Sequence, residues 1–191
     1  MGVPMQKPSL ADFLEWEEAQ AERHEFWRGE IFAMVGGRRG HGRIVANLMR
    51  HLGNQLDGTP CQAFSEAMLV QVGDDAVLYP DVFVTCDREF SAEQSVFTAP
   101  VLVVEVPSPS TQACDRSRKF AIYRRLESLR EYALIDPDTR QVEVFRPGDD
   151  SLWNLLDMSD DAALELASVG CRIALADLFK GMDSGAAGAA S

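Results

Sequence analysis

Apolar residues recur along the chain with the periods of helices and strands, and clusters of glycine, proline and aspartate separate these segments. The pattern predicts amphipathic helices, two apolar central strands and several hairpins. The expected elements, in chain order, are a helix at 9–23, a hairpin at 24–35, a glycine-rich loop at 36–42, a helix at 41–56, a strand at 61–72, central strands at 79–84 and 100–106, a helix at 114–127, a hairpin at 130–145, short antiparallel strands within 153–174 and a helix at 175–179. Helices and strands mixed in this order are typical of an α/β fold.

The two central strands each contain one carboxylate in an otherwise apolar run. Asp81 lies near the start of the first strand, and Glu105 lies near the end of the second. Strands rich in valine and leucine are typically buried on both faces, where a carboxylate is costly unless it is paired or binds a metal. Lys119 lies on the next helix, on one face with Asp115 and Tyr123. The pattern predicts a shared site for a divalent cation, with Lys119 beside it.

These residues also have structural interpretations, which the sequence leaves open. Asp81 could cap a turn beside the proline that precedes it, and Glu105 could pair with an arginine. Lys119 could be a surface lysine that pairs with Asp115 four residues earlier. In each case the residue would stabilise the fold and have no part in chemistry.

Two further polar residues are weaker candidates for the site. His41 follows the glycine-rich loop, where it is expected to be a loop or helix-cap residue; contact with a phosphate is the alternative. Glu66 has the parity of the apolar residues in the strand at 61–72. It is expected to face solvent at a strand end, with a place near the site as the alternative.

Composition limits the chain to a few protein classes. Its 191 residues suit one domain, expected over residues 1–183, followed by a disordered Gly/Ala/Ser tail at 184–191. No apolar run approaches the roughly 20 residues of a membrane span, and the N-terminus has no signal-peptide core. The four cysteines are widely spaced without a CxxC pair, which predicts reduced thiols and argues against structural zinc. The expected location is therefore cytoplasmic.

The charge distribution bears on the choice of partner. A net charge of −12 disfavours non-specific binding to nucleic acid. More than half of the 18 basic residues nevertheless lie in two clusters, at 38–50 and 116–130. The candidate contacts to DNA phosphates are Arg38, Arg39, His41 and Arg116. Solvated helix faces are the alternative interpretation of both clusters.

Several short motifs occur together in this chain. They are Tyr79-Pro80-Asp81-Val82, the segment 102–111 around Glu105, Asp115-Arg116, the segment 119–123, the segment 131–137, and His24-Glu25 through Gly29-Glu30 with the later His41. In combination they resemble the PD-(D/E)XK nuclease superfamily and, within it, the Uma-type family of restriction-endonuclease-like proteins. The resemblance extends over residues 9–180. It implies a restriction-endonuclease-like mixed β-sheet flanked by α-helices, with antiparallel hairpins at the C-terminus.

The resemblance also implies a site that hydrolyses DNA phosphodiester bonds with Mg²⁺ or Mn²⁺. Asp81 and Glu105 match the superfamily's metal-binding carboxylates, and Glu25 matches an N-terminal acid that completes the metal site. The superfamily's lysine normally stands two residues after the glutamate, where this chain has Pro107. Lys119 on the following helix is the natural substitute, either to orient the attacking water or to stabilise charge in the transition state.

Three functions are consistent with the sequence. The first is a Mg²⁺-dependent DNA endonuclease, the second a non-catalytic DNA-binding module with the same fold, and the third a structural homo-oligomer. A homo-oligomer, most simply a dimer, is expected because short strands late in the chain leave sheet edges that need covering. Cation-dependent cleavage of a plasmid separates the first function from the other two.

Overall fold

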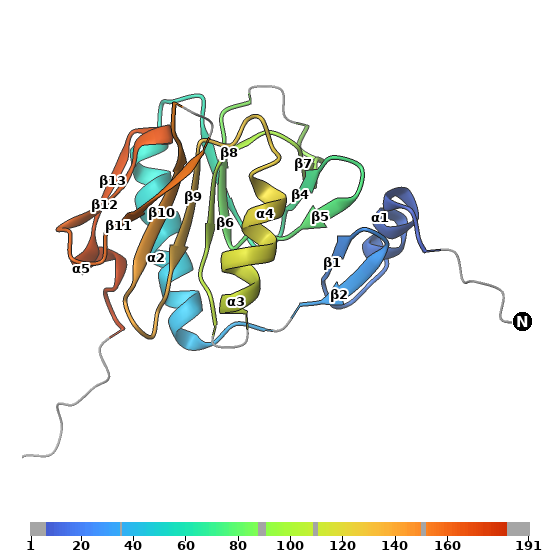
Figure 1. Cartoon of the computed structure of the whole chain (residues 1–191), viewed down its shortest axis with the longest axis horizontal. Helices are drawn as coiled ribbons and strands as arrows, with labels where there is room; N and C mark the ends of the chain where they lie inside the picture. Colours follow the sequence, from blue (N-terminus) through green and yellow to red (C-terminus); the bar gives the residue numbers. More distant parts are fainter. Residues whose placement is uncertain (1–6, 35, 88–90, 109–110, 150–151, 183–191) are drawn as a thin grey trace, which may run out of the picture.

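A six-stranded mixed sheet lies at the centre of the molecule in the computed structural model (Figure 1). The structure describes residues 7–34, 36–87, 91–108, 111–149 and 152–182. In spatial order the strands are β11 (Trp153–Asp157), β10 (Val142–Pro147), β9 (Glu131–Ile135), β8 (Pro100–Glu105), β6 (Val82–Thr85) and β3 (Gln62–Ser65). β8 and β9 are parallel, whereas the other neighbours are antiparallel. The tail expected at 184–191 lies outside the described residues.

Helices cover both faces of this sheet (Figure 1). The helices and the small hairpin that lie on the two faces are α2 (Arg39–Leu56), α3 (Gln112–Cys114), η1 (Asp115–Lys119), α4 (Phe120–Tyr123), β12 (Ala163–Leu166), η2 (Ala167–Val169), β13 (Cys171–Ala174) and α5 (Leu175–Leu178). α2, the β12–β13 hairpin and α5 share one core with the sheet, and α4 shares another on the opposite face. The predicted α/β arrangement with C-terminal antiparallel hairpins is confirmed. Of the helices within the described ranges, none combines the length and apolar character that a membrane crossing requires.

A second, five-stranded sheet packs on the α4 side and carries the N-terminal elements. Its strands, in spatial order, are β2 (Glu30–Ala33), β1 (His24–Trp27), β5 (Ala76–Leu78), β4 (Leu69–Val72) and β7 (Val96–Phe97). Val70 and Leu78 of this sheet lie in one apolar core with Ile122 of α4. Helix α1 (Leu10–Glu18) covers the sheet through Phe13, whose ring stacks on Phe26 of β1 at 5.1 Å between centroids. This packing holds β1 next to the helical segment α3–η1–α4.

Alternation along β6 and β8 determines the face on which the central carboxylates lie. Phe83 and Val103 are register partners, and both lie in the core on the α4 side. Asp81 stands two residues before Phe83 and Glu105 two after Val103, so both side chains point to that same face. Because β6 and β8 are antiparallel, the two carboxylates also lie opposite one another at the same end of the strand pair.

The first helix and the glycine-rich loop are both shorter than predicted. The helix predicted at 9–23 ends at Glu18. The Glu17 carboxylate accepts a hydrogen bond of 2.8 Å from the backbone N–H of His24, which closes a turn in place of further helix. Helix α2 begins inside the loop predicted at 36–42, because burial of its apolar face outweighs the low helix propensity of its first glycines.

The strand predicted at 61–72 is two strands that belong to different sheets. β3 joins the central sheet and β4 joins the five-stranded sheet. Between them Glu66 has a φ of 43°, a left-handed conformation that is uncommon outside glycine. Its backbone N–H donates to the carbonyl of Asp81 at 3.3 Å, and the Arg23 guanidinium donates to the Glu66 carbonyl. The prediction of one continuous strand is therefore wrong, and Glu66 is turned out of line with its neighbours.

The helix predicted at 114–127 begins and ends earlier and contains a π-helical turn. α3, η1 and α4 follow one another without a break from Gln112 to Tyr123. The π turn is η1, in which the hydrogen bonds span five residues. Such turns are rare and frequently occur at functional sites. This one carries Asp115 and Lys119, whose charged ends lie 3.7 Å apart.

Cys61 and Cys86 form a disulfide, so the prediction of reduced thiols is wrong for this pair. They lie immediately beyond the paired ends of β3 and β6, where the antiparallel register brings neighbouring positions together. The pairing depends on the register of β3 against β6, so a separation of 25 residues in the sequence does not predict it. Cys114 and Cys171 are free, as expected.

Candidate functional site

Asp81 and Glu105 line one cavity of about 340 Å³, here called the acidic cavity. The Glu105 side chain is 2% exposed and the Asp81 side chain 13%, so solvent screens neither charge well. Asp81 Oδ2 accepts a hydrogen bond of 2.6 Å from the backbone N–H of Val106, the residue that follows β8. The two carboxylates that the strand pattern singles out therefore face the same space.

Lys119 connects carboxylates from different parts of the fold. Its Nζ atom lies 3.0 Å from Oε1 of Glu25 on β1 and 3.3 Å from Oε1 of Glu105 on β8. The same atom lies 3.7 Å from Oδ1 of Asp115, at the start of the π turn. The structure therefore brings Glu25, Glu105 and Lys119 together at one place. The alternative of a surface lysine does not apply, because the Lys119 side chain is only 13% exposed.

Burial dominates the protonation chemistry of this group. It raises the pKa of Glu105 well above its usual value, and the neighbouring ammonium group of Lys119 opposes the rise only in part. Burial also raises the pKa of Asp81, against the His41 ring and the Val106 N–H. Burial lowers the pKa of Lys119, but the surrounding carboxylates outweigh it and hold that pKa well above its usual value. The pKa of both carboxyl groups rises because one ammonium group does not compensate for the burial of several carboxylates, and a bound cation would stabilise their charged forms.

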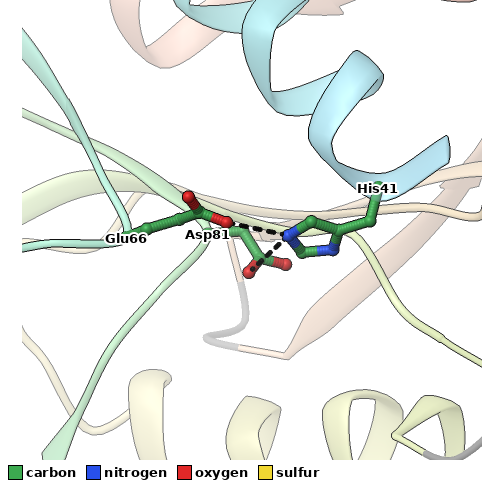
Figure 2. A group of neighbouring side chains, drawn as sticks. All are labelled: His41, Glu66 and Asp81. Atoms are coloured by element: carbon green, nitrogen blue, oxygen red, sulfur yellow. Dashed lines mark hydrogen bonds and ion pairs between the residues drawn. The ribbon is translucent and has the colours of Figure 1, made fainter. Parts of the chain in front are cut away.

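His41, in the first turn of α2, extends the acidic group beyond the strands (Figure 2). Its Nε2 atom lies 3.0 Å from Oε1 of Glu66 and 3.5 Å from Oδ1 of Asp81. Burial lowers the pKa of His41, but Asp81, Glu66 and the Val106 carbonyl outweigh it and raise this pKa above its usual value. His41 is thus a helix-start residue, as expected, that also lines the acidic cavity. Glu66 directly follows β3 and its side chain is 47% exposed, as expected of a residue at a strand end, and its contact with His41 also places it near the site.

The candidate phosphate contacts lie in different surroundings. Arg38 immediately precedes α2 and lines the acidic cavity together with His41. Arg39 lines a second cavity. Arg116 pairs with the buried carboxylate of Glu143, with 2.7 Å between Nη1 and Oε1. Of the four candidates, Arg38 and His41 are therefore the two that line the acidic cavity.

Asp115 and Arg118 also line the acidic cavity, although neither was a predicted site residue. The spacing of four residues between Asp115 and Lys119 could have identified the first. Arg118 has no local signal, because its position depends on the β1–β2 hairpin. Its guanidinium carbon lies 5.1 Å from the ring centroids of both Trp27 and Phe32, which hold the charge at the cavity wall.

The residues of the acidic cavity fit a divalent cation. Carboxylate oxygens are the ligands that Mg²⁺ and Mn²⁺ prefer, and an imidazole nitrogen suits Mn²⁺ as well. His41 and Asp81, which line the cavity, and Glu66, which contacts His41, can each supply one ligand atom, and these atoms all lie within 4.8 Å of one another. The Tyr123 hydroxyl is buried and has no hydrogen-bond partner among the described residues. Burial, with the charges of Glu105 and Glu25, raises the pKa of Tyr123, as expected for a phenol close to excess negative charge.

The chain is similar to one protein family over nearly its whole length. The model of the Uma2 family, described as "Putative restriction endonuclease", matches residues 10–176. Two similar proteins come from Synechocystis sp. (strain ATCC 27184 / PCC 6803 / Kazusa). The uncharacterized protein slr1290 is 36% identical over 181 residues, which cover 94% of this chain and 95% of that protein. The uncharacterized protein sll1609 is 32% identical over 163 residues, which cover 83% of this chain and 92% of that protein.

A solved structure with the same fold gives a further comparison. It is a crystal structure of a protein from Anabaena variabilis ATCC 29413, described as a putative nuclease belonging to DUF820. The TM-score is 0.74, and the match covers 92% of this chain and 99% of the other, with 23% sequence identity. At this identity the likeness concerns the fold. It confirms the prediction of a restriction-endonuclease-like mixed sheet flanked by helices.

Proposed function

Because the chain belongs to the Uma2 family, we propose that it is an endonuclease that hydrolyses DNA phosphodiester bonds with a bound Mg²⁺ or Mn²⁺ ion. The observation that carries the proposal is the acidic cavity. In it, the buried ammonium group of Lys119 lies among the carboxylates of Glu25 and Glu105, and Asp81 lines the same space. Oxygen ligands for a cation beside a fixed positive charge are the groups that phosphodiester hydrolysis requires.

Each residue has a distinct role in this proposal. Asp81, Glu105 and Glu25 would hold the cation, which supplies an activated water and neutralises charge on the phosphate. The Val106 N–H keeps the Asp81 carboxylate in one orientation. Lys119 offers hydrogen bonds to the attacking water or to a phosphate oxygen, and its charge stabilises the negative charge that develops in the transition state.

Binding of DNA would rely on local positive charge, because the chain as a whole is acidic. Arg38 and Arg118 line the acidic cavity and can contact the phosphates next to the one attacked. Arg39 lies on the same helix as His41, and Arg116 lies within the π turn. Arg39 and Arg116 would contact phosphates of the DNA that lie further from the cavity.

The proposal predicts cation-dependent nicking of DNA. Supercoiled plasmid should be converted to open circles with Mg²⁺ or Mn²⁺, and it should stay intact with EDTA or with Ca²⁺. Asp81→Asn, purified in parallel, controls for contaminating nucleases. If the plasmid stays intact with every metal tested and the protein binds DNA in Ca²⁺, the protein is a DNA-binding module and the endonuclease proposal is wrong.

We also propose that the protein forms a homodimer. The support is β11, an edge strand of the central sheet on which Leu155 is 49% exposed. An edge strand with exposed apolar residues is stabilised when another chain covers it. Light scattering should therefore give twice the chain mass, and a monomer mass over a wide concentration range would contradict the proposal.

A further inference from the structure

We propose that His41 and Glu66 bind a divalent cation together with Asp81, and that this trio determines which metal the site accepts. The trio was not predicted from the sequence, which assigned the metal to Asp81, Glu105 and Glu25. The inference rests on the proposed function for its part in DNA cleavage. Metal binding by the trio can nevertheless be measured without any cleavage.

The distances from the His41 nitrogen to the two carboxylate oxygens suit one ion. Nε2 of His41 lies 3.0 Å from Oε1 of Glu66 and 3.5 Å from Oδ1 of Asp81, and Figure 2 shows both carboxylates directed at that nitrogen. Ligand atoms about 2.1 Å from a common ion are about 3.0 Å apart in octahedral geometry and about 3.4 Å apart in tetrahedral geometry. The two distances from Nε2 are close to these two values, and all three ligand atoms lie within 4.8 Å of one another.

The backbone of Val106 orients two of the three ligands. Its carbonyl oxygen lies 3.0 Å from Nδ1 of His41. A carbonyl only accepts, so Nδ1 carries the proton, and in the neutral ring the lone pair is on Nε2. Histidines that bind metals usually donate their other N–H in this way. The Val106 N–H donates to Oδ2 of Asp81 and leaves Oδ1 facing the imidazole.

The charges of the trio are not matched by a fixed cation. Lys119 pairs with Glu25, Glu105 and Asp115, none of which belongs to the trio. Within the described part of the chain, neither Glu66 nor Asp81 has an ion pair with a lysine or arginine side chain. When a metal ion displaces the proton on Nε2, His41 is neutral and the two carboxylates carry two negative charges, which a divalent cation balances.

Solvent access also suits an ion that exchanges with bulk water. The Glu66 side chain is 47% exposed, whereas those of His41 and Asp81 are 14% and 13% exposed. An ion could enter beside Glu66 and be held by the two buried ligands. One imidazole with two carboxylates suits Mn²⁺, Co²⁺ or Zn²⁺ better than Mg²⁺ or Ca²⁺, which prefer oxygen ligands alone.

Calorimetric titration of the metal-free full-length chain with Mn²⁺ tests the assignment. His41→Gln and Glu66→Gln should each weaken Mn²⁺ binding at least about tenfold and reduce the preference for Mn²⁺ over Mg²⁺. His51→Gln is the matched control, because His51 lies on the same helix and contacts Arg50 instead. Wild-type Mn²⁺ affinity in both His41→Gln and Glu66→Gln would overturn the proposal.

Pulsed electron paramagnetic resonance of bound Mn²⁺ gives a second readout that needs no substitution in its first arm. The wild-type chain should show hyperfine coupling to an imidazole nitrogen, and His41→Gln should lose it while His51→Gln keeps it. No nitrogen coupling in the wild-type chain would overturn the proposal, even if His41→Gln did not fold. Mn²⁺ binding that depends on His41 without plasmid nicking would refute the proposed function and leave this inference standing. Plasmid nicking by a protein whose metal affinity is independent of His41 would support the proposed function and refute this inference.

Discussion

Replacing Lys119 by methionine should lower the free energy of unfolding of the metal-free protein by about 3–5 kcal/mol. The substitution keeps an unbranched side chain and removes the ammonium group that lies 3.0 Å from Glu25 and 3.3 Å from Glu105. These two carboxylates are 14% and 2% exposed, so water cannot replace the lost partner. Removing one member of a buried ion pair is costly because the other charge stays buried.

The loss should grow as pH rises. Burial already raises the pKa of Glu105 in the folded protein, and without Lys119 that pKa moves further above its unfolded value. Between the two pKa values the folded state binds more protons than the unfolded state, so stability falls with increasing pH. The destabilisation should therefore be small near pH 4, close to the unfolded pKa of a glutamate, and larger near about pH 8.

Urea unfolding of Lys119→Met and the wild-type chain at both pH values provides the measurement. Lys180→Met is the matched control, because Lys180 is exposed and its replacement should leave stability nearly unchanged. Lys119→Arg restores a positive charge and should recover part of the loss. Equal stability of Lys119→Met and wild type at the higher pH would show that the ammonium group does not support the buried carboxylates.

The position of the central carboxylates could be predicted because it depends on the simplest periodicity of the chain. Asp81 and Glu105 interrupt apolar strands, and the strand period of two determines the face to which each side chain points. The helical period likewise predicted that Lys119 and Asp115 share a face. These are local rules, and they required no knowledge of how distant segments meet.

The remainder of the site depends on contacts between distant segments. Glu66 reaches His41 because its backbone takes a left-handed conformation, which ends β3 and sends the chain to another sheet. The apolar residues on both sides of Glu66 follow one strand pattern, so periodicity predicts a single strand and does not indicate the break between β3 and β4. The pairing of Arg116 with Glu143 depends likewise on the packing of η1 against β10. Patterns within a single segment carry no information about such pairings.

Lys119→Ala should reduce the rate of metal-dependent DNA cleavage about 10² to 10³-fold, which corresponds to about 3–4 kcal/mol of transition-state stabilisation. The alanine removes the ammonium group that can orient the attacking water or stabilise developing charge. Mn²⁺ affinity should stay intact or improve slightly, because a positive charge next to the carboxylates is lost. Asp81→Asn should instead weaken metal binding, since a charged oxygen ligand becomes neutral.

Lys119→Arg separates the catalytic effect from the structural one. Arginine restores the charge and part of the stability, but its planar guanidinium cannot reproduce a compact ammonium group, so cleavage should remain low. Cleavage rates and Mn²⁺ calorimetry on the same preparations, below the unfolding temperature of each variant, measure both effects. If Lys119→Ala cleaves DNA at the wild-type rate while Asp81→Asn is inactive, the lysine has no catalytic role. The carboxylates and their metal would then carry the chemistry without it.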